Sequence, residues 1–216
     1  MLLWNMGEKN MKDRIDEMKN FWEETQKIEN CKTLSGCQYD ETVEFLMVKN
    51  ILFPKMHVLE IGVGVGYVTK GFFDAGYIVS GMDISEVALK RVEEYCEATY
   101  TLDKLNELPS NYFDIIICHN VVQHVPTDIL ITEFEHFMRA LKEDGVFAVE
   151  FISSESNVDG GISATQAQVQ SGTIYRNPQI MEKIINGVGG KCDMVVNNKI
   201  VIGDVIGCHV FHIKNK

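Results

Sequence analysis

The sequence predicts an α/β fold built on a mostly parallel sheet whose last strand is antiparallel, with a helical segment in front. From residue 56 onward, short apolar runs alternate with amphipathic helical patterns, which is typical of strands joined by helical crossovers. The run from Asp114 to Cys118 is apolar on both faces, as a central parallel strand must be. Only Gly203 and Asp204 separate the last two apolar runs, and so short a link cannot make a parallel crossover.

The sequence predicts a helical cap or lid at residues 1 to 54, followed along the chain by a main domain at residues 55 to 216. One apolar stripe recurs at helical spacing through Met11, Ile15, Met18 and Trp22. A second stripe over residues 43 to 51 stops before Pro54, because the residue that precedes a proline avoids the helical conformation. We therefore expect two helices here and no independent core.

The sequence of the main domain predicts that strands and helices alternate until its last third. The expected strands lie at residues 58 to 61, 77 to 82, 99 to 102, 114 to 118, 146 to 152, 192 to 202 and 205 to 213. Four helices are expected. The first covers residues 67 to 75 and ends before Gly76, the second begins after its cap Ser85, the third begins at about Thr127, and the fourth begins after its cap Asn177. A Ser/Gly/Gln-rich loop is expected at residues 153 to 173.

Composition and charge exclude several classes of protein. A chain of 216 residues with 45% hydrophobic and 24% charged residues predicts one globular domain with an embellishment. The net charge is −11 and the basic residues are scattered, which argues against nucleic acid or an anionic membrane as the main partner. No apolar stretch approaches the ~20 residues of a membrane span. We expect a cytoplasmic protein with a small-molecule substrate, either a monomer or a homodimer.

The cysteines predict neither a disulfide framework nor a metal site. The six cysteines form no C-x-x-C pair and have no histidine at zinc-finger spacing. We expect reduced, mostly buried thiols and no bound metal.

A glycine-rich turn is the first candidate site. Gly62, Gly64 and Gly66 alternate where the first strand ends and a helix begins, so the backbone can turn sharply and approach a ligand closely. The dinucleotide pattern G-x-G-x-x-G/A would need a small residue where the sequence has Tyr67 or Thr69, which disfavours an oxidoreductase. A purely structural turn remains the alternative.

Asp83 is the second candidate, because it stands where the second strand ends. In an open α/β sheet, an acidic residue at this point commonly accepts hydrogen bonds from both hydroxyls of a ribose. The alternative is a helix cap, but Ser85 already suits that role. We predict that Asp83 binds a ribose.

The glycine turn, Asp83 and three later stretches follow one another between residues 56 and 152, and together they resemble class I S-adenosylmethionine-dependent methyltransferases of the small-molecule type. The later stretches are Leu102 to Asp114, Cys118 to Val125, and Leu141 to Gly145. The resemblance implies a Rossmann-like, doubly wound sheet of seven strands that binds S-adenosyl-L-methionine and releases S-adenosyl-L-homocysteine. The residues that it places around this donor are Glu60, Gly62, Gly64, Gly66, Asp83, Ile84, Asp103 and His119. Alternatively, Glu60 is a buried acid satisfied by backbone donors, and Asp103 is a solvated loop acid.

Reactive groups are expected just beyond the fourth and fifth strands, because ligands of open α/β sheets bind at the carboxyl ends of the strands. The available acid–base groups are His119, His124, Tyr175 and Glu150. Histidine is the natural base because its usual pKa is close to working pH. We expect His124 to be either the base or a residue that fixes its loop, and the resemblance suggests that His119 holds the donor.

The substrate is expected to contact Asn120, Tyr175, Arg176 and Tyr39. Arg176 could pair with a carboxylate or phosphate of the substrate, or form a surface salt bridge. Tyr39, Phe21 and Trp22 could form a lid that excludes water, or pack as core, which we favour for Trp22.

The predicted function is methyl transfer to an oxygen or nitrogen of a small molecule, a sugar or another metabolite. One alternative is a methyltransferase acting on the amino-terminal amine of proteins, to which His124 and the Arg176 region also conform. That class places Asn where this sequence has Ile152, and its acidic loop is reduced here to Glu155 and Asp159. The other alternative is a non-catalytic nucleoside-binding scaffold, because a fold does not establish an activity.

Overall fold

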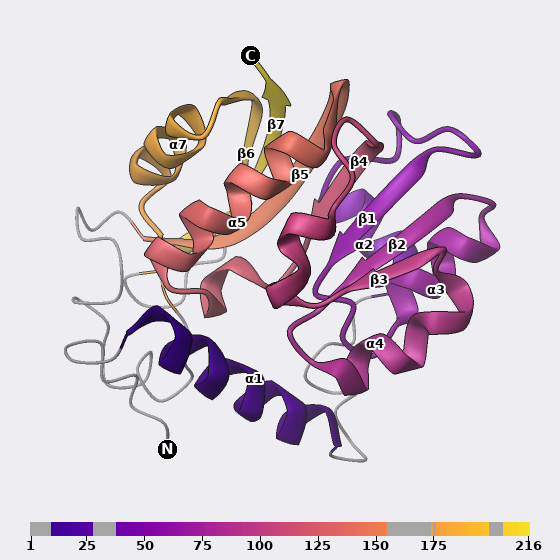
Figure 1. The fold of residues 1–216 in the computed structure, drawn as a ribbon. Helices are drawn as coiled ribbons and strands as arrows, with labels where there is room; N and C mark the ends of the chain where they lie inside the picture. The colour runs from indigo at the N-terminus through magenta and orange to yellow at the C-terminus, as the bar shows by residue number, and fades with distance from the viewer. Residues whose placement is uncertain (1–9, 28–37, 155–173, 175, 199–204) are drawn as a thin grey trace.

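The computed structural model describes residues 10–27, 38–154, 174, 176–198 and 205–216, and its centre is a seven-stranded sheet. The strands are β1 (His57–Ile61), β2 (Ile78–Met82), β3 (Ala98–Tyr100), β4 (Phe113–Cys118), β5 (Leu141–Ser154), β6 (Gly190–Asn198) and β7 (Val205–Asn215). Their order across the sheet is β3-β2-β1-β4-β5-β7-β6 (Figure 1). The strand order reverses direction between β1 and β4, which is the point where ligands of open α/β sheets bind.

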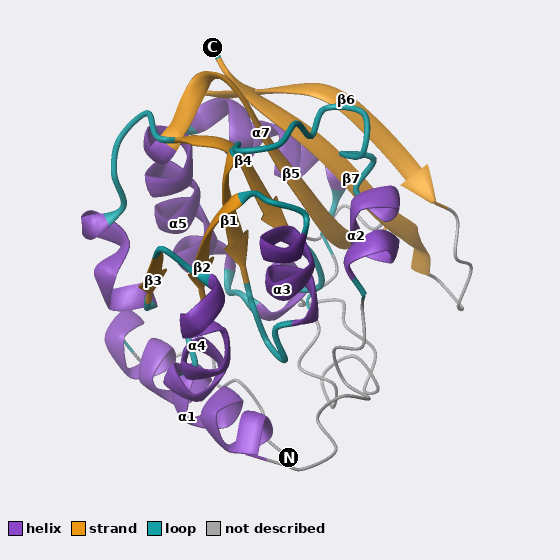
Figure 2. Ribbon diagram, turned by 90° about the vertical axis from the view of Figure 1, so that its right-hand side faces the viewer, coloured by secondary structure: helices purple, strands orange, loops and turns teal. Residues whose placement is uncertain are grey.

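Helices cover both faces of this sheet. They are α1 (Met11–Lys27), α2 (Tyr39–Phe45), α3 (Tyr67–Asp74), α4 (Glu86–Val92), α5 (Thr127–Ala140) and α7 (Pro178–Gly187), with short 3₁₀ turns η2 (Glu93–Tyr95), η3 (Leu102–Glu107) and η4 (Val122–His124). α2 and α3 pack on one face, and α5 and α7 on the other (Figure 2). The predicted doubly wound α/β fold is confirmed.

The central strands are parallel and bury both faces, as their apolar runs predict. β1 pairs in parallel with β2 and β4, with Leu59 beside Ile116 of β4. Leu59 and Ile116 pack in the core under α5, while Val58 and Ile115 pack in the core under α2 and α3. Successive side chains of a strand point to opposite faces, so a strand covered by helices on both sides must be apolar throughout.

The carboxyl-terminal strands confirm the predicted antiparallel end. β7 lies between β5 and β6 and is antiparallel to both. β5 is longer than expected, because it begins directly after α5 at Leu141. β6 begins at Gly190, before the expected residue 192.

The second amino-terminal helix is shorter than its apolar stripe predicts. α2 ends at Phe45, and Met47 has a left-handed φ of 56° that a helix cannot accommodate. Leu46 and Val48 are nevertheless buried, while Met47 is exposed, so the stripe continues as a turn. The Leu46 carbonyl accepts a 2.6 Å hydrogen bond from Nε2 of His212 in β7, which ties this turn to the sheet.

α1 crosses the carboxyl edge of the sheet from the α5 side to the α4 side (Figure 1). Arg14 pairs with Asp128 at the start of α5. Near the other end, a carboxylate oxygen of Glu23 accepts a 2.6 Å hydrogen bond from the backbone N–H of Glu86 in the first turn of α4. The helix is thus held at both ends.

The described residues offer neither a membrane helix nor a metal cluster. Within them, no helix has the length and apolarity needed to cross a bilayer, and no group of three or more metal-binding side chains converges. Cys96, Cys118, Cys192 and Cys208 are free thiols, while Cys31 and Cys37 lie outside the described residues.

Candidate active site

The glycine turn after β1 adopts a backbone that side chains would disturb. Gly62, Gly64 and Gly66 have φ values of 79°, 51° and 86°. A Cβ atom on Gly62 would lie 2.2 Å from Cγ2 of Val121, and one on Gly66 would lie 2.7 Å from Cγ1 of Val92. Gly62 and Gly64 line a cavity, whereas Gly66 caps α3 and supports the turn from behind.

Asp83 lies across this turn at the end of β2. Its Oδ2 accepts a 3.0 Å hydrogen bond from the backbone N–H of Gly64, and its Oδ1 accepts one of 2.9 Å from Ser85. Burial raises the pKa of the carboxyl group, and these two N–H groups oppose that rise by favouring the charged form. Each oxygen keeps a lone pair for a further donor, and the side chain lines the same cavity as Gly62 and Gly64.

The cavity occupies about 290 Å³ at the carboxyl ends of β1, β2 and β4. It is closed by one face of α1 and by the segment that follows β4. Its walls are Met18, Trp22, Gln26, Ile61, Gly62, Gly64, Met82, Asp83, Ile84, Leu102, His119, Asn120, Val121, Gln123, His124, Val125 and Glu133. Ile84 is therefore where the resemblance implies, beside Asp83.

Glu60 faces a smaller cavity behind the glycine turn. Its Oε2 accepts a 2.5 Å hydrogen bond from Oγ1 of Thr69 in α3, so a side-chain hydroxyl satisfies it rather than the backbone donors we considered. Burial raises the pKa of Glu60 to about 8, with the charge of Asp83 adding to the rise. This cavity of about 50 Å³ also reaches His119 and Asn120.

His119 and Asn120 lie where β4 ends and border both cavities. The His119 ring stacks on Phe45 with centroids 5.0 Å apart, and its Nδ1 is 3.2 Å from Oγ1 of Thr42. Burial lowers the pKa of His119 to about 4, so the ring is neutral at physiological pH. Asn120 has a φ of 60°, and its N–H donates a 2.9 Å hydrogen bond to the buried Glu150.

His124 lines the cavity from η4, beneath α1. Its ring meets the Trp22 indole edge to face, with centroids 5.0 Å apart. Trp22 is thus a wall of the cavity, which corrects our preference for plain core packing. Phe21 is exposed and packs against the edge of Trp22.

Several predicted contact residues do not reach the cavity. Tyr39 packs on Phe72 and over Gly71, on the α3 face of the sheet, with ring centroids 4.9 Å apart for the aromatic pair. Asp103 is exposed in η3 and does not line the cavity, whereas its neighbour Leu102 does. Tyr175 lies outside the described residues.

Arg176 requires a correction as a substrate contact. Its side chain is fully buried, and its guanidinium donates to the carbonyls of Val122 and Val125 and to Oγ1 of Thr127. These bonds fasten η4 to the start of α5, which makes Arg176 a structural residue and not a surface ion pair either. Sequence alone could not show this, because arginine is rarely buried in full.

Sequence analysis missed Gln26, Gln123 and Glu133, which are polar residues of the cavity wall. Each is more than nine-tenths buried. A signal was present for Glu133, because it interrupts the apolar face of the helix between Leu130 and Phe134. An acid on a buried helix face needs a partner or a role.

Comparisons with known proteins agree with this geometry. Residues 59–149 match the family model described as a methyltransferase domain. The ubiquinone biosynthesis O-methyltransferases of Glaesserella parasuis and Haemophilus ducreyi are 31% and 30% identical over 116 residues, which are 48% of this chain and 48% of each relative. The chain thus spans about half the length of the curated relatives it matches.

Solved structures extend the likeness in fold to almost the whole chain. The 1,6-didemethyltoxoflavin-N1-methyltransferase of Burkholderia thailandensis superposes with a TM-score of 0.72 at 13% identity, covering 97% of this chain and 92% of that one. The magnesium protoporphyrin IX methyltransferase of Synechocystis, solved with bound S-adenosylmethionine, gives 0.58 at 17% identity, covering 99% and 88%. Residues 59–149 therefore resemble a methyltransferase domain in sequence, and the chain shares its fold with solved methyltransferases that hold S-adenosylmethionine or S-adenosylhomocysteine.

Proposed function

We propose that this protein transfers a methyl group from S-adenosylmethionine to an oxygen or nitrogen of a small molecule, a sugar or another metabolite. One observation carries the proposal. Asp83 and Gly64 are hydrogen-bonded to each other across the glycine turn, and both face a cavity at the carboxyl ends of the strands. A carboxylate and an open backbone at this point form a site for a ribose and the group attached to it.

The residues present fit the donor in polarity and charge. Asp83 can accept from ribose hydroxyls, while Ile84, Leu102 and Val121 offer apolar walls for a base. His119 stays neutral above a pH of about 4, so it places no positive charge beside a sulfonium. The chemistry supplied by S-adenosylmethionine when bound is an electrophilic methyl group on that sulfonium, which leaves as a neutral thioether.

The protein's own part is to align the acceptor, exclude water and receive a proton where the nucleophile carries one. We assign the exclusion of water to α1, because Met18 and Trp22 cover the cavity and the helix is held at α5 and α4. His124 is the proposed base, because its ring lines the cavity under Trp22. In this assignment α1 supplies the lid of the site, while α2 packs beside α3 and takes no part in it.

The names of the relatives support both kinds of nucleophile without deciding between them. The curated relatives are O-methyltransferases, and the solved structure from Burkholderia thailandensis is an N1-methyltransferase. A site covered by a helix suits a small acceptor, which it can enclose together with the donor.

Calorimetry with S-adenosylhomocysteine tests the donor site directly. We expect the wild type to bind it, NAD to give no heat, and Asp83→Ala to weaken binding by about 1 to 3 kcal/mol through lost buried hydrogen bonds. Asp103→Ala is the matched control, because this exposed acid is off the cavity wall and its removal should leave binding unchanged. Equal losses in the two variants, or a wild type that prefers NAD, would refute the donor site.

Transfer of label from methyl-labelled S-adenosylmethionine tests the acceptor class. We expect label in a pool of small metabolites and none in amino-terminal peptides. Labelled peptides would favour the protein-methylating alternative, and binding of the donor without any transfer would favour the scaffold.

A further inference from the structure

Glu133 is a buried acid that the proposed donor site does not use. It lies on the apolar face of α5, is 7% exposed, and borders the cavity. In the part of the chain that the structure describes, no group hydrogen-bonds its carboxyl group. Because its side chain lines the cavity, the hydrogen bonds that this carboxyl group can make are available to a molecule bound there.

Glu133 and Asp83 mark different ends of the cavity. Asp83 acts on Glu60, behind the glycine turn, where its charge raises the pKa of that acid. The charge that acts on Glu133 is Arg176, whose guanidinium is bonded to the carbonyls of η4. Glu133 therefore lies on the η4 side, with His124, and away from the expected ribose.

The cavity wall offers acids to a ligand but no permanent cation. Asp83 and Glu133 are its carboxyl groups, and the described wall includes no lysine or arginine. Arg176 is buried behind η4 and its N–H groups are directed at carbonyls and a hydroxyl. An acceptor that carried a carboxylate or phosphate would lose its hydration here without gaining a lysine or arginine partner from the described wall.

Burial also raises the pKa of Glu133 to about 8, with Arg176 opposing the rise. At neutral pH the group is therefore largely protonated, and it can donate one hydrogen bond and accept others. Such a group can pair with a hydroxyl or N–H of a ligand, as acceptor through its carbonyl oxygen and as donor through its O–H.

On the basis of the methyl transfer proposed above, we propose that Glu133 binds and positions the methyl acceptor. The acceptor is then a neutral or cationic molecule that presents an O–H or N–H group to this carboxyl group. Molecules with a carboxylate or phosphate at that position are rejected, which reverses the expectation that Arg176 recognises an anion.

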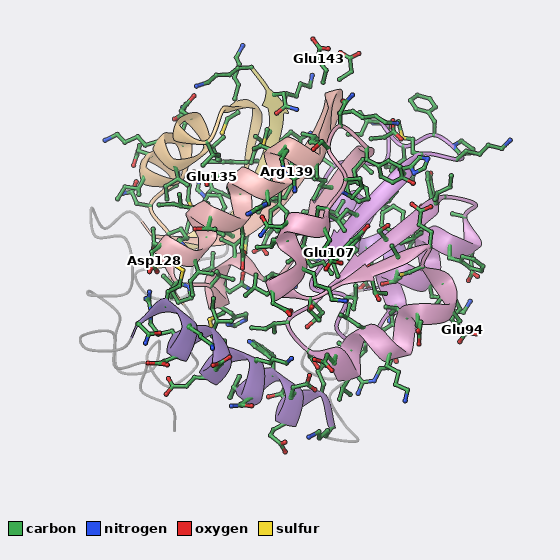
Figure 3. All side chains as sticks on the ribbon, in the orientation of Figure 1. Glu94, Glu107, Asp128, Glu135, Arg139 and Glu143 are labelled. Atoms are coloured by element: carbon green, nitrogen blue, oxygen red, sulfur yellow. The ribbon has the colours of Figure 1, made fainter. Side chains whose placement is uncertain are left out.

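The test uses three probes that share one hydroxylated ring and differ in charge: catechol, dopamine and 3,4-dihydroxybenzoate. Their binding to the full chain saturated with S-adenosylhomocysteine is measured at pH 7 by ligand-observed NMR. The variants are Glu133→Leu, which removes the hydrogen bond, and Glu133→Gln, which keeps it. Glu135→Leu is the matched control, because Glu135 lies on the same helix, is exposed and is labelled in Figure 3.

We expect the wild type to bind catechol and dopamine about tenfold more tightly than 3,4-dihydroxybenzoate. Glu133→Leu should bind catechol and dopamine about tenfold more weakly than the wild type, which is the effect of one buried hydrogen bond. Glu133→Gln should retain the binding of catechol, and Glu135→Leu should behave as the wild type. The affinity for S-adenosylhomocysteine should be the same in all four proteins. Urea unfolding checks that the variants fold, which the apolar surroundings of residue 133 favour.

Four results would overturn the inference about Glu133: tightest binding of the anionic probe, no effect of Glu133→Leu, no binding of any probe, or a loss of S-adenosylhomocysteine affinity in Glu133→Leu. The last result would assign Glu133 to the donor. A wild type that does not bind S-adenosylhomocysteine would instead overturn the methyl transfer itself, so the two failures are distinguishable.

Discussion

Replacing Gly62 by alanine tests whether the glycine turn is held by packing as well as by backbone conformation. The φ of 79° costs an alanine about 1 to 2 kcal/mol relative to glycine. The new Cβ would also lie 2.2 Å from Cγ2 of Val121, and overpacking of this kind costs typically about 1 to 3 kcal/mol. We therefore expect Gly62→Ala to lower the free energy of unfolding by about 2 to 5 kcal/mol.

Gly76 supplies the matched control, because it shares the conformation but not the contact. Its φ is 84°, and a Cβ there would meet nothing within 4 Å. Gly76→Ala should cost only the conformational part, about 1 to 2 kcal/mol. Val121→Ala in the Gly62→Ala background should recover the difference, since it removes the clashing methyl group.

The assay is urea unfolding followed by Trp fluorescence, with S-adenosylhomocysteine affinity measured on the same proteins. Equal losses of stability in Gly62→Ala and Gly76→Ala would show that the turn does not pack against Val121 as described. Failure of Val121→Ala to restore any stability would point to the same error.

Three further predictions concern single side chains. Glu60 has a pKa of about 8 in the folded protein and 4.5 in the unfolded chain, so its bound proton favours folding, and this contribution is lost as the pH rises from about 4.5 to 8. In urea titrations, Glu60→Gln should make the free energy of unfolding depend less on pH over that interval. An unchanged pH dependence would contradict the burial of a neutral acid. His124→Gln should lower kcat about 100-fold or more while leaving S-adenosylhomocysteine affinity intact, as measured by turnover and calorimetry, and an unchanged kcat would leave His124 a loop residue only. Arg176→Met should destabilise the protein by about 1 to 3 kcal/mol in urea unfolding, because it strands the carbonyl of Val125. A variant of normal stability with weakened acceptor binding would restore Arg176 as a substrate contact.

The sequence by itself determined the succession and direction of the strands and the meeting of Asp83 with the glycine turn. Apolar periodicity distinguishes a strand buried on both faces from a helix with one buried face, and the short link at Gly203 permits only an antiparallel last strand. Asp83 and the glycine turn could be paired in advance, because parallel strands bring their carboxyl ends to one edge of the sheet.

Only the tertiary structure decided which buried side chains face the cavity and which face the core. Periodicity shows that one side of a helix is covered, but what covers it is set by elements far away in the chain. Trp22 lies on the same stripe as core residues and yet contacts His124 in the wall of the cavity. Arg176 looked exposed and is buried, because the carbonyls that it satisfies belong to a turn some fifty residues earlier. Glu133 became significant only when its helix face was seen to open on that same cavity.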